Sequence, residues 1–157
     1  MNEDYLKLFK RFNVNLSMSL PGFSNFKKLT GVDNAENVLY WFQRGSSLGL
    51  RTTCNVTVTK QNIDELYETL ALALLNGSSS ILLNRFLPGG RGLSYMDDLL
   101  LSNEQINEML DTAEKVLSES GRYGHVGTEI PLCIIRAPAK YKHLSIGYKC
   151  AAAKSFS

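Results

Sequence analysis

Polar and cationic side chains follow directly after an apolar run near the middle of the chain. Residues 81–83 are Ile-Leu-Leu, and they are followed by Asn84, Arg85 and the turn-forming segment 88–92 (PGGRG). Short apolar runs are typical of strands in parallel sheets, whose ligand sites lie beyond the carboxyl ends of the strands. Asn84 and Arg85 are therefore candidate ligand contacts. Arg85 has the fork geometry to bind a carboxylate, and a structural ion pair is the alternative.

Two further polar residues lie in strand-like segments earlier in the chain. Ser19 stands near the end of an alternating segment, residues 14–20, just before Pro21 and Gly22. Its hydroxyl can donate and accept a hydrogen bond, which suits a ligand, and a turn serine is the alternative. Asn55 lies inside the segment 50–59, although asparagine is disfavoured in strands. Its amide either contacts a ligand or makes a buried hydrogen bond within the fold.

The three cysteines do not form a disulfide framework, because their number is odd and their spacing is wide. Cys54 falls in an apolar strand pattern and is expected to be a small buried residue. Cys133 and Cys150 fall in a loop-like C-terminal stretch, where thiolates are candidate metal ligands. Two ligands cannot complete a four-coordinate site, so an ordinary pair of free thiols is the alternative.

Composition indicates one globular domain. The chain has 157 residues with 44% hydrophobic and 20% charged residues, which is enough for a real core. A net charge of +2 is too small to argue for a nucleic-acid partner or an anionic membrane surface. No apolar run approaches the roughly 20 residues of a membrane span, and the acidic N-terminus lacks a signal-peptide pattern. A cytoplasmic location is therefore expected, with no nucleic-acid or membrane partner.

Hydrophobic periodicity alternates along the chain between helical and strand-like segments. Helix-capping boxes are expected at Asp33/Glu36, Asn62/Glu65 and Ser102/Gln105. The strict alternation implies βαβ units with right-handed crossovers and a parallel sheet, which is an α/β fold. The pattern predicts helices over residues 3–12, 33–45, 62–77 and 102–121, and strands over residues 14–20, 50–59, 79–86 and 127–135.

Several short motifs, taken in order, resemble the second half of radical SAM enzymes that carry a SPASM-type C-terminal extension. The matching segments are residues 19–22 (SLPG), 29–31 (LTG) with the helix after it, 55–62 (NVTVTKQN), 84–92 (NRFLPGGRG), 130–133 (IPLC) and 147–151 (GYKCA). The resemblance covers nearly the whole chain. Each motif alone has low specificity, and their shared order carries the resemblance.

The resemblance implies a partial (βα)6 barrel, truncated at both ends. Residues 1–126 would be the C-terminal half of the barrel, and residues 127–157 would begin a SPASM-like extension. It implies S-adenosylmethionine (SAM) and a [4Fe–4S] cluster as cofactors of the full-length family, and a peptide or protein substrate. Ser19, Asn55, Asn84 and Arg85 would contact SAM. Cys133 and Cys150 would ligate an auxiliary iron–sulfur cluster.

The chain also departs from the family pattern. The cluster-binding Cys-x-x-x-Cys-x-x-Cys motif is absent, and Pro21 replaces the aspartate of the Ser-Leu-Asp-Gly element. The chain is therefore expected to be a fragment, from a truncated gene, a split gene or a fragmentary gene model, to lack the cluster and to be inactive alone. A partner chain with the N-terminal half would complete the enzyme.

The alternative is a non-catalytic binding or assembly module that pairs through an open sheet edge. A compact nucleotide binder ranks last. A phosphate-binding glycine loop should open directly into a helix, whereas about ten residues separate Gly92 from the expected helix start at Ser102.

Overall fold

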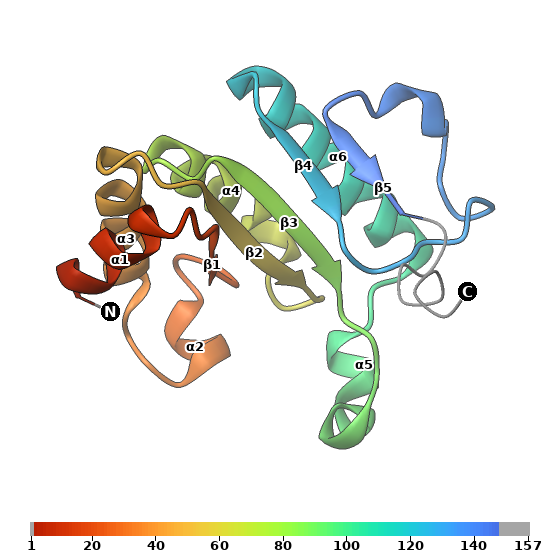
Figure 1. Cartoon of the computed structure of the whole chain (residues 1–157). Coiled ribbons are helices and arrows are strands. Elements are labelled where there is room, and N and C mark those ends of the chain that lie inside the picture. The colour runs from red at the N-terminus through yellow and green to blue at the C-terminus, as the bar shows by residue number, and fades with distance from the viewer. Residues whose placement is uncertain (1, 148–157) are drawn as a thin grey trace, which may run out of the picture.

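The computed structural model describes residues 2–147 and shows an α/β fold built on one five-stranded parallel sheet (Figure 1). All four strand pairs are parallel, and the strands lie in the same order in space as in the chain. The strands are β1 (Leu16–Ser19), β2 (Thr52–Val58), β3 (Ser80–Arg85), β4 (Tyr123–Val126) and β5 (Leu144–Ile146).

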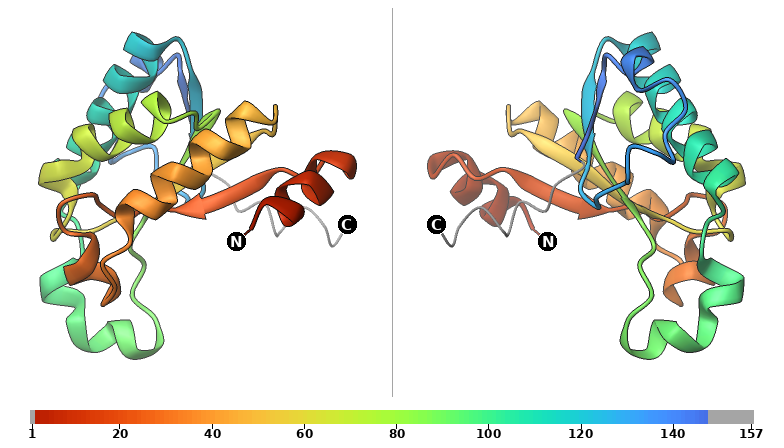
Figure 2. Two further views of the ribbon diagram at one scale, coloured as in Figure 1. Left: turned by 90° about the vertical axis from the view of Figure 1, so that its left-hand side faces the viewer. Right: turned by 90° about the vertical axis from the view of Figure 1, so that its right-hand side faces the viewer.

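The long helices α3 (Ala35–Ser47), α4 (Leu66–Leu75) and α6 (Asn103–Ser120) connect successive strands and gather on one face of the sheet (Figure 2). When each right-handed crossover moves the chain one strand in the same direction, every connecting helix falls on the same side. The sheet is therefore wound as in a barrel, and the predicted α/β class with a partial barrel agrees with it. The helices are α1 (Glu3–Arg11), α2 (Phe26–Thr30), α3 (Ala35–Ser47), α4 (Leu66–Leu75), α5 (Met96–Leu99) and α6 (Asn103–Ser120), and 3-10 turns span Ile63–Glu65, Gly90–Tyr95 and Pro138–Lys140.

The core lies between the sheet and the crossover helices. Because strand side chains alternate between faces, every second residue of β2 points at the helices, and these residues are buried. Ile81 and Leu83 are fully buried, as are Leu70 of α4 and Leu110 of α6. Each such side chain contributes about 1.5–3 kcal/mol to the stability of the fold by leaving water.

The helix starts were predicted with mixed success. The capping box at α6 is confirmed, because the Gln105 backbone N–H donates to Ser102 Oγ at 3.2 Å and the Ser102 N–H donates to Gln105 Oε1 at 3.0 Å. The box at Asp33 is wrong, since α3 begins after Asn34. The Asp33 carboxylate instead lies 3.8 Å from Lys27 Nζ in an exposed ion pair.

The C-terminal third differs from the expectation. No strand spans residues 127–135, where a strand was predicted and where Pro131 falls. Instead β4 comes directly after Gly121, which ends α6 in the left-handed conformation (φ 63°). Strand β5, only three residues long, had no visible periodicity and was not predicted, and neither were the short helices α2 and α5. Since β5 pairs with β4, residues 144–146 extend the same sheet.

Candidate ligand site on the open face of the sheet

The face of the sheet opposite the crossover helices is polar. The strand register places two rows of side chains on it, and none of their members is Asp, Glu, Lys or Arg. One row is Ser17, Thr53, Ser80 and Tyr123, and the other is Ser19, Asn55, Leu82, His125 and Ser145. Hydroxyl, amide and imidazole groups therefore line this face, which suits a ligand that is recognised by hydrogen bonds.

Two predicted site residues bond to each other on this face. Asn84 Nδ2 donates to Asn55 Oδ1 at 3.0 Å, across the β2–β3 pair. Among residues 2–147, neither amide makes another hydrogen bond, so Asn55 Nδ2 and Asn84 Oδ1 are free to donate and accept. Gly127 permits the close approach of the chain after β4, because a Cβ there would lie 2.5 Å from Asn84 Oδ1.

Ser19 lies beside Asn55, since the two are paired residues of β1 and β2. It is exposed, and it ends its strand as predicted. Ser19, Asn55 and Asn84 thus lie on one face of three neighbouring strands, with Ser19 and Asn84 close to the carboxyl ends of β1 and β3 and Asn55 in the middle of β2.

Arg85 lies apart from this group. It is the next residue after Asn84, so its side chain leaves the opposite face of β3. Its Nε and Nη2 atoms donate to the Glu129 carbonyl oxygen at 3.3 and 3.2 Å, and its backbone N–H donates to Thr128 Oγ1 at 2.9 Å. Arg85 therefore ties the segment after β4 to the end of β3, and its contact with SAM stays a prediction.

The predicted role of Asn62 is wrong. It was expected to cap a helix, but its side chain makes no cap and is only 2% exposed. Its Nδ2 donates to the carbonyl oxygens of Pro21 at 2.6 Å and Thr57 at 3.0 Å, and its Oδ1 accepts from the Thr59 N–H at 2.7 Å. Asn62 therefore joins the loop after β1 to the loop after β2.

Glu65 reinforces the same junction. Its Oε2 accepts from the backbone N–H groups of Ser24 at 3.0 Å and Asn25 at 3.3 Å. Its Oε1 packs against Gly22, where a Cβ would come within 2.1 Å, and this oxygen is buried without a partner among the described residues. A side chain at this position of the SLPG motif would therefore displace the Glu65 carboxylate. The sequence signal for Asn62 and Glu65 was present, but their three-residue spacing indicated a local cap.

The cysteines have separate environments. Cys54 is fully buried on the helix-facing side of β2, and burial raises the pKa of its thiol to about 12, so it stays protonated at neutral pH. Cys133 is exposed, and Cys150 lies outside the described residues. Within residues 2–147, no group of three or more His, Cys, Asp or Glu side chains is placed to hold a metal ion. Ligation of a cluster by Cys133 and Cys150 stays a prediction.

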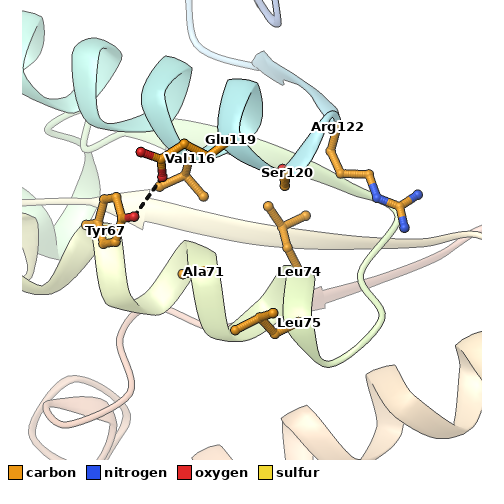
Figure 3. Close-up of a pocket in the computed structure, with 8 residues that line it drawn as sticks. All are labelled: Tyr67, Ala71, Leu74, Leu75, Val116, Glu119, Ser120 and Arg122. Atoms are coloured by element: carbon orange, nitrogen blue, oxygen red, sulfur yellow. Dashed lines mark hydrogen bonds between the residues drawn. The ribbon is translucent and has the colours of Figure 1, made fainter.

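A groove of about 380 Å³ lies on the other side of the molecule, between α4 and α6 (Figure 3). Tyr67 and Glu119 close one end with a 2.7 Å hydrogen bond, and Leu74 lines its apolar floor. It is separated from the polar face by the sheet and shares no residue with the candidate site.

No described helix is long and apolar enough to cross a bilayer.

Comparison with known proteins gives one sequence relative of interest. No family model matches the chain. Over 107 residues it is 29% identical to a probable GTP 3′,8-cyclase from Sulfurisphaera tokodaii, a radical SAM enzyme. The alignment covers 68% of this chain and 32% of the cyclase. This similarity supports a relationship with the radical SAM superfamily.

Comparison with solved structures gives phosphonopyruvate hydrolase in complex with oxalate and Mg²⁺. The TM-score is 0.44 at 10% sequence identity, with 80% of this chain and 52% of the other covered.

Proposed function

We propose that this chain is part of a radical SAM protein and that its open sheet face contacts SAM. The observation that carries the proposal is that Ser19, Asn55 and Asn84 share the open face of three neighbouring parallel strands, with Ser19 and Asn84 close to the carboxyl ends of β1 and β3. Ligands of parallel sheets bind at these ends. The sequence similarity to a GTP 3′,8-cyclase supports the same superfamily.

The donor set fits the polar parts of SAM. A ribose hydroxyl both donates and accepts, and the Asn55–Asn84 pair offers a free N–H group and a free carbonyl oxygen. The Ser19 hydroxyl can donate to a carboxylate or accept from an ammonium group. When SAM is bound and reduced in this superfamily, it supplies a 5′-deoxyadenosyl radical. The role that the residues of this chain support is to bind and orient SAM.

The described residues do not fit a [4Fe–4S] cluster. They hold no set of three ligands, and the Cys-x-x-x-Cys-x-x-Cys motif is absent from the sequence. No cleavage step is therefore assigned to this chain. The proposal includes a partner polypeptide that carries the cluster and the remaining strands, with Cys133 and Cys150 as auxiliary SPASM ligands and a peptide or protein as the substrate. The relative is named for a reaction of GTP, so a nucleotide is the competing substrate class.

Titration calorimetry with SAM tests the binding site. We expect Asn55→Ala and Asn84→Ala to weaken SAM binding about two- to tenfold each, the value of a lost hydrogen bond. Asn37→Ala, on the exposed surface of α3, is the matched control and should bind like the unchanged protein. No binding of SAM, or equal affinity for all four proteins, would refute the site.

A second assay tests the missing cluster. After iron–sulfur reconstitution and reduction, we expect no 5′-deoxyadenosine from this chain alone. Robust cleavage of SAM would refute the assignment of the cluster to a partner.

The alternative function is a non-catalytic assembly module, and the free edge of β1 favours it. Among residues 2–147, β1 pairs only with β2, so one edge of the sheet is open. A neighbouring reading frame that encodes the Cys-x-x-x-Cys-x-x-Cys half would favour the enzyme, and a stable protein without that neighbour would favour the module.

A further inference from the structure

The free edge of β1 has a sequence that reads the same in both directions. Residues 16–20 are Leu-Ser-Met-Ser-Leu, a palindrome centred on Met18. An antiparallel strand of identical sequence, related by a two-fold axis through Met18, would place Leu16 opposite Leu20, Ser17 opposite Ser19 and Met18 opposite itself. Residues of like character would then stand opposite each other at every position of the pair. We propose that β1 pairs with β1 of a second copy of this chain in this register.

The backbone groups of β1 point the right way for this pairing. The N–H groups of Leu16 and Leu20 donate inward, to the carbonyl oxygens of Arg51 and Asn55 of the β2 side, both at 3.0 Å. Because backbone groups alternate along a strand, those of Ser17 and Ser19 point to the open edge. In the proposed register Ser17 of one copy exchanges both backbone hydrogen bonds with Ser19 of the other. Met18 then forms a non-hydrogen-bonded pair with its symmetry mate.

The faces of the two sheets match in this arrangement. The two-fold axis stands perpendicular to the sheet, so the helices of both copies lie on the same side. Leu16 and Met18 are both partly exposed on that side, where Met18 would meet Met18 of the second copy, whereas Leu20 stays buried in its own core. The Ser17 and Ser19 hydroxyls would meet on the polar face. A slip of one residue would bring serine against leucine or methionine and is therefore disfavoured.

The edge also lacks the usual protection against pairing. Exposed edge strands are commonly blunted by lysine, proline or a bulge. None of these occurs in residues 16–20. Apolar side chains stand close to the start of the strand, where Phe12 is 65% and Val14 40% exposed. In an antiparallel pair this start lies beside the loop after β1 of the second copy, which would cover them. The inference does not rest on the proposed function.

Disulfide cross-linking tests the register. In a chain with Cys133→Ser and Cys150→Ser, Met18→Cys should form a dimer under mild oxidation. The Cα atoms of a non-hydrogen-bonded pair are about 4.5 Å apart, within the range of a disulfide. Leu16→Cys is the matched control on the same strand and face, and it should remain monomeric on a non-reducing gel because each cysteine faces Leu20. Equal cross-linking of the two variants, or none of Met18→Cys, would overturn the proposal.

Light scattering after size-exclusion chromatography tests the association itself. The unchanged chain should elute with twice its mass of 17.5 kDa. Ser17→Pro removes an outward N–H and leaves the bonds to β2 in place, so it should elute as a monomer with an unchanged circular dichroism spectrum. A monomeric unchanged chain at about 100 µM, a concentration at which even weak specific pairs associate, would overturn the proposal. In that case the β1 edge would remain available for pairing with a strand of another polypeptide.

Discussion

The Glu114 carboxylate is predicted to hold the last strand of the sheet onto α6. It accepts hydrogen bonds from three consecutive backbone N–H groups: Lys142 at 3.0 Å, His143 at 3.0 Å and Leu144 at 2.9 Å. The ring nitrogen Nδ1 of His143 lies 3.1 Å from the same carboxylate. The Glu114 side chain is only 17% exposed, so water cannot fully replace these bonds. Strand β5 begins at Leu144, directly at this contact.

The loss of stability expected from disrupting the Glu114 contact follows from the number of hydrogen bonds that its carboxylate accepts. A hydrogen bond to a charged group contributes about 1.5–3 kcal/mol net, and bonds that share one acceptor are not additive. Glu114→Gln keeps the shape but removes the charge and turns an N–H₂ group toward one of the backbone donors. We expect it to lower the free energy of unfolding by about 2–3 kcal/mol. Urea unfolding measures the loss, and amide hydrogen exchange should show faster exchange at residues 142–146.

The pH dependence has a definite sign. Burial raises the pKa of Glu114, but the hydrogen bonds from Lys142, His143 and Leu144 outweigh it and hold the pKa below its usual value of 4.5. The folded pKa therefore lies below the unfolded one. The stability from this contact is complete above the unfolded pKa and is lost as pH falls from about 4.5 through the folded pKa. In Glu114→Gln this part of the acid dependence should disappear.

A matched control lies on the same helix. Glu108 is exposed, and its side chain makes no hydrogen bond or ion pair with any described residue. Glu108→Gln should change the free energy of unfolding by less than about 0.5 kcal/mol. If Glu114→Gln proves as mild as this control, or if residues 142–146 exchange at an unchanged rate, the anchoring role of Glu114 is wrong.

Three further predictions test the packing. Asn62→Ala should lower the free energy of unfolding by about 2–4 kcal/mol in urea titration, because it leaves buried backbone groups without hydrogen-bond partners. A loss below about 1 kcal/mol would contradict the role of Asn62 in joining the loops after β1 and β2. Gly22→Ala should cost about 1–3 kcal/mol through overpacking, whereas Gly89→Ala, with nothing within 4 Å of the new Cβ, should be neutral in the same titration. At pH 8 a thiol reagent should label Cys133 quickly and Cys54 only on unfolding; fast labelling of both in the native protein would contradict the burial of Cys54.

Sequence periodicity predicted the elements whose signals are local. The helix start at Ser102 is a short-range hydrogen-bond pattern, and the strand at residues 80–85 is an apolar run between turn residues, so both could be recognised from neighbouring residues alone. The role of Asn62 and Glu65 could not be recognised this way, because both also bond to residues about forty positions earlier, in the loop after β1. Strand β5 is too short for periodicity to reveal it. It depends on pairing with β4 and on the Glu114 contact.

The polar face connects the fold with the proposed site. The apolar run at residues 81–83 predicts a strand of a parallel sheet, and in the structure Ile81 and Leu83, which point at the helices, are fully buried. Leu82 is partly exposed on the other face, in the row that contains Asn55 and His125. A single aliphatic side chain among hydroxyl, amide and imidazole groups cannot form a second core. The open face therefore lacks the apolar side chains needed to pack against another apolar layer. Its hydroxyl, amide and imidazole groups can instead form hydrogen bonds with a polar ligand.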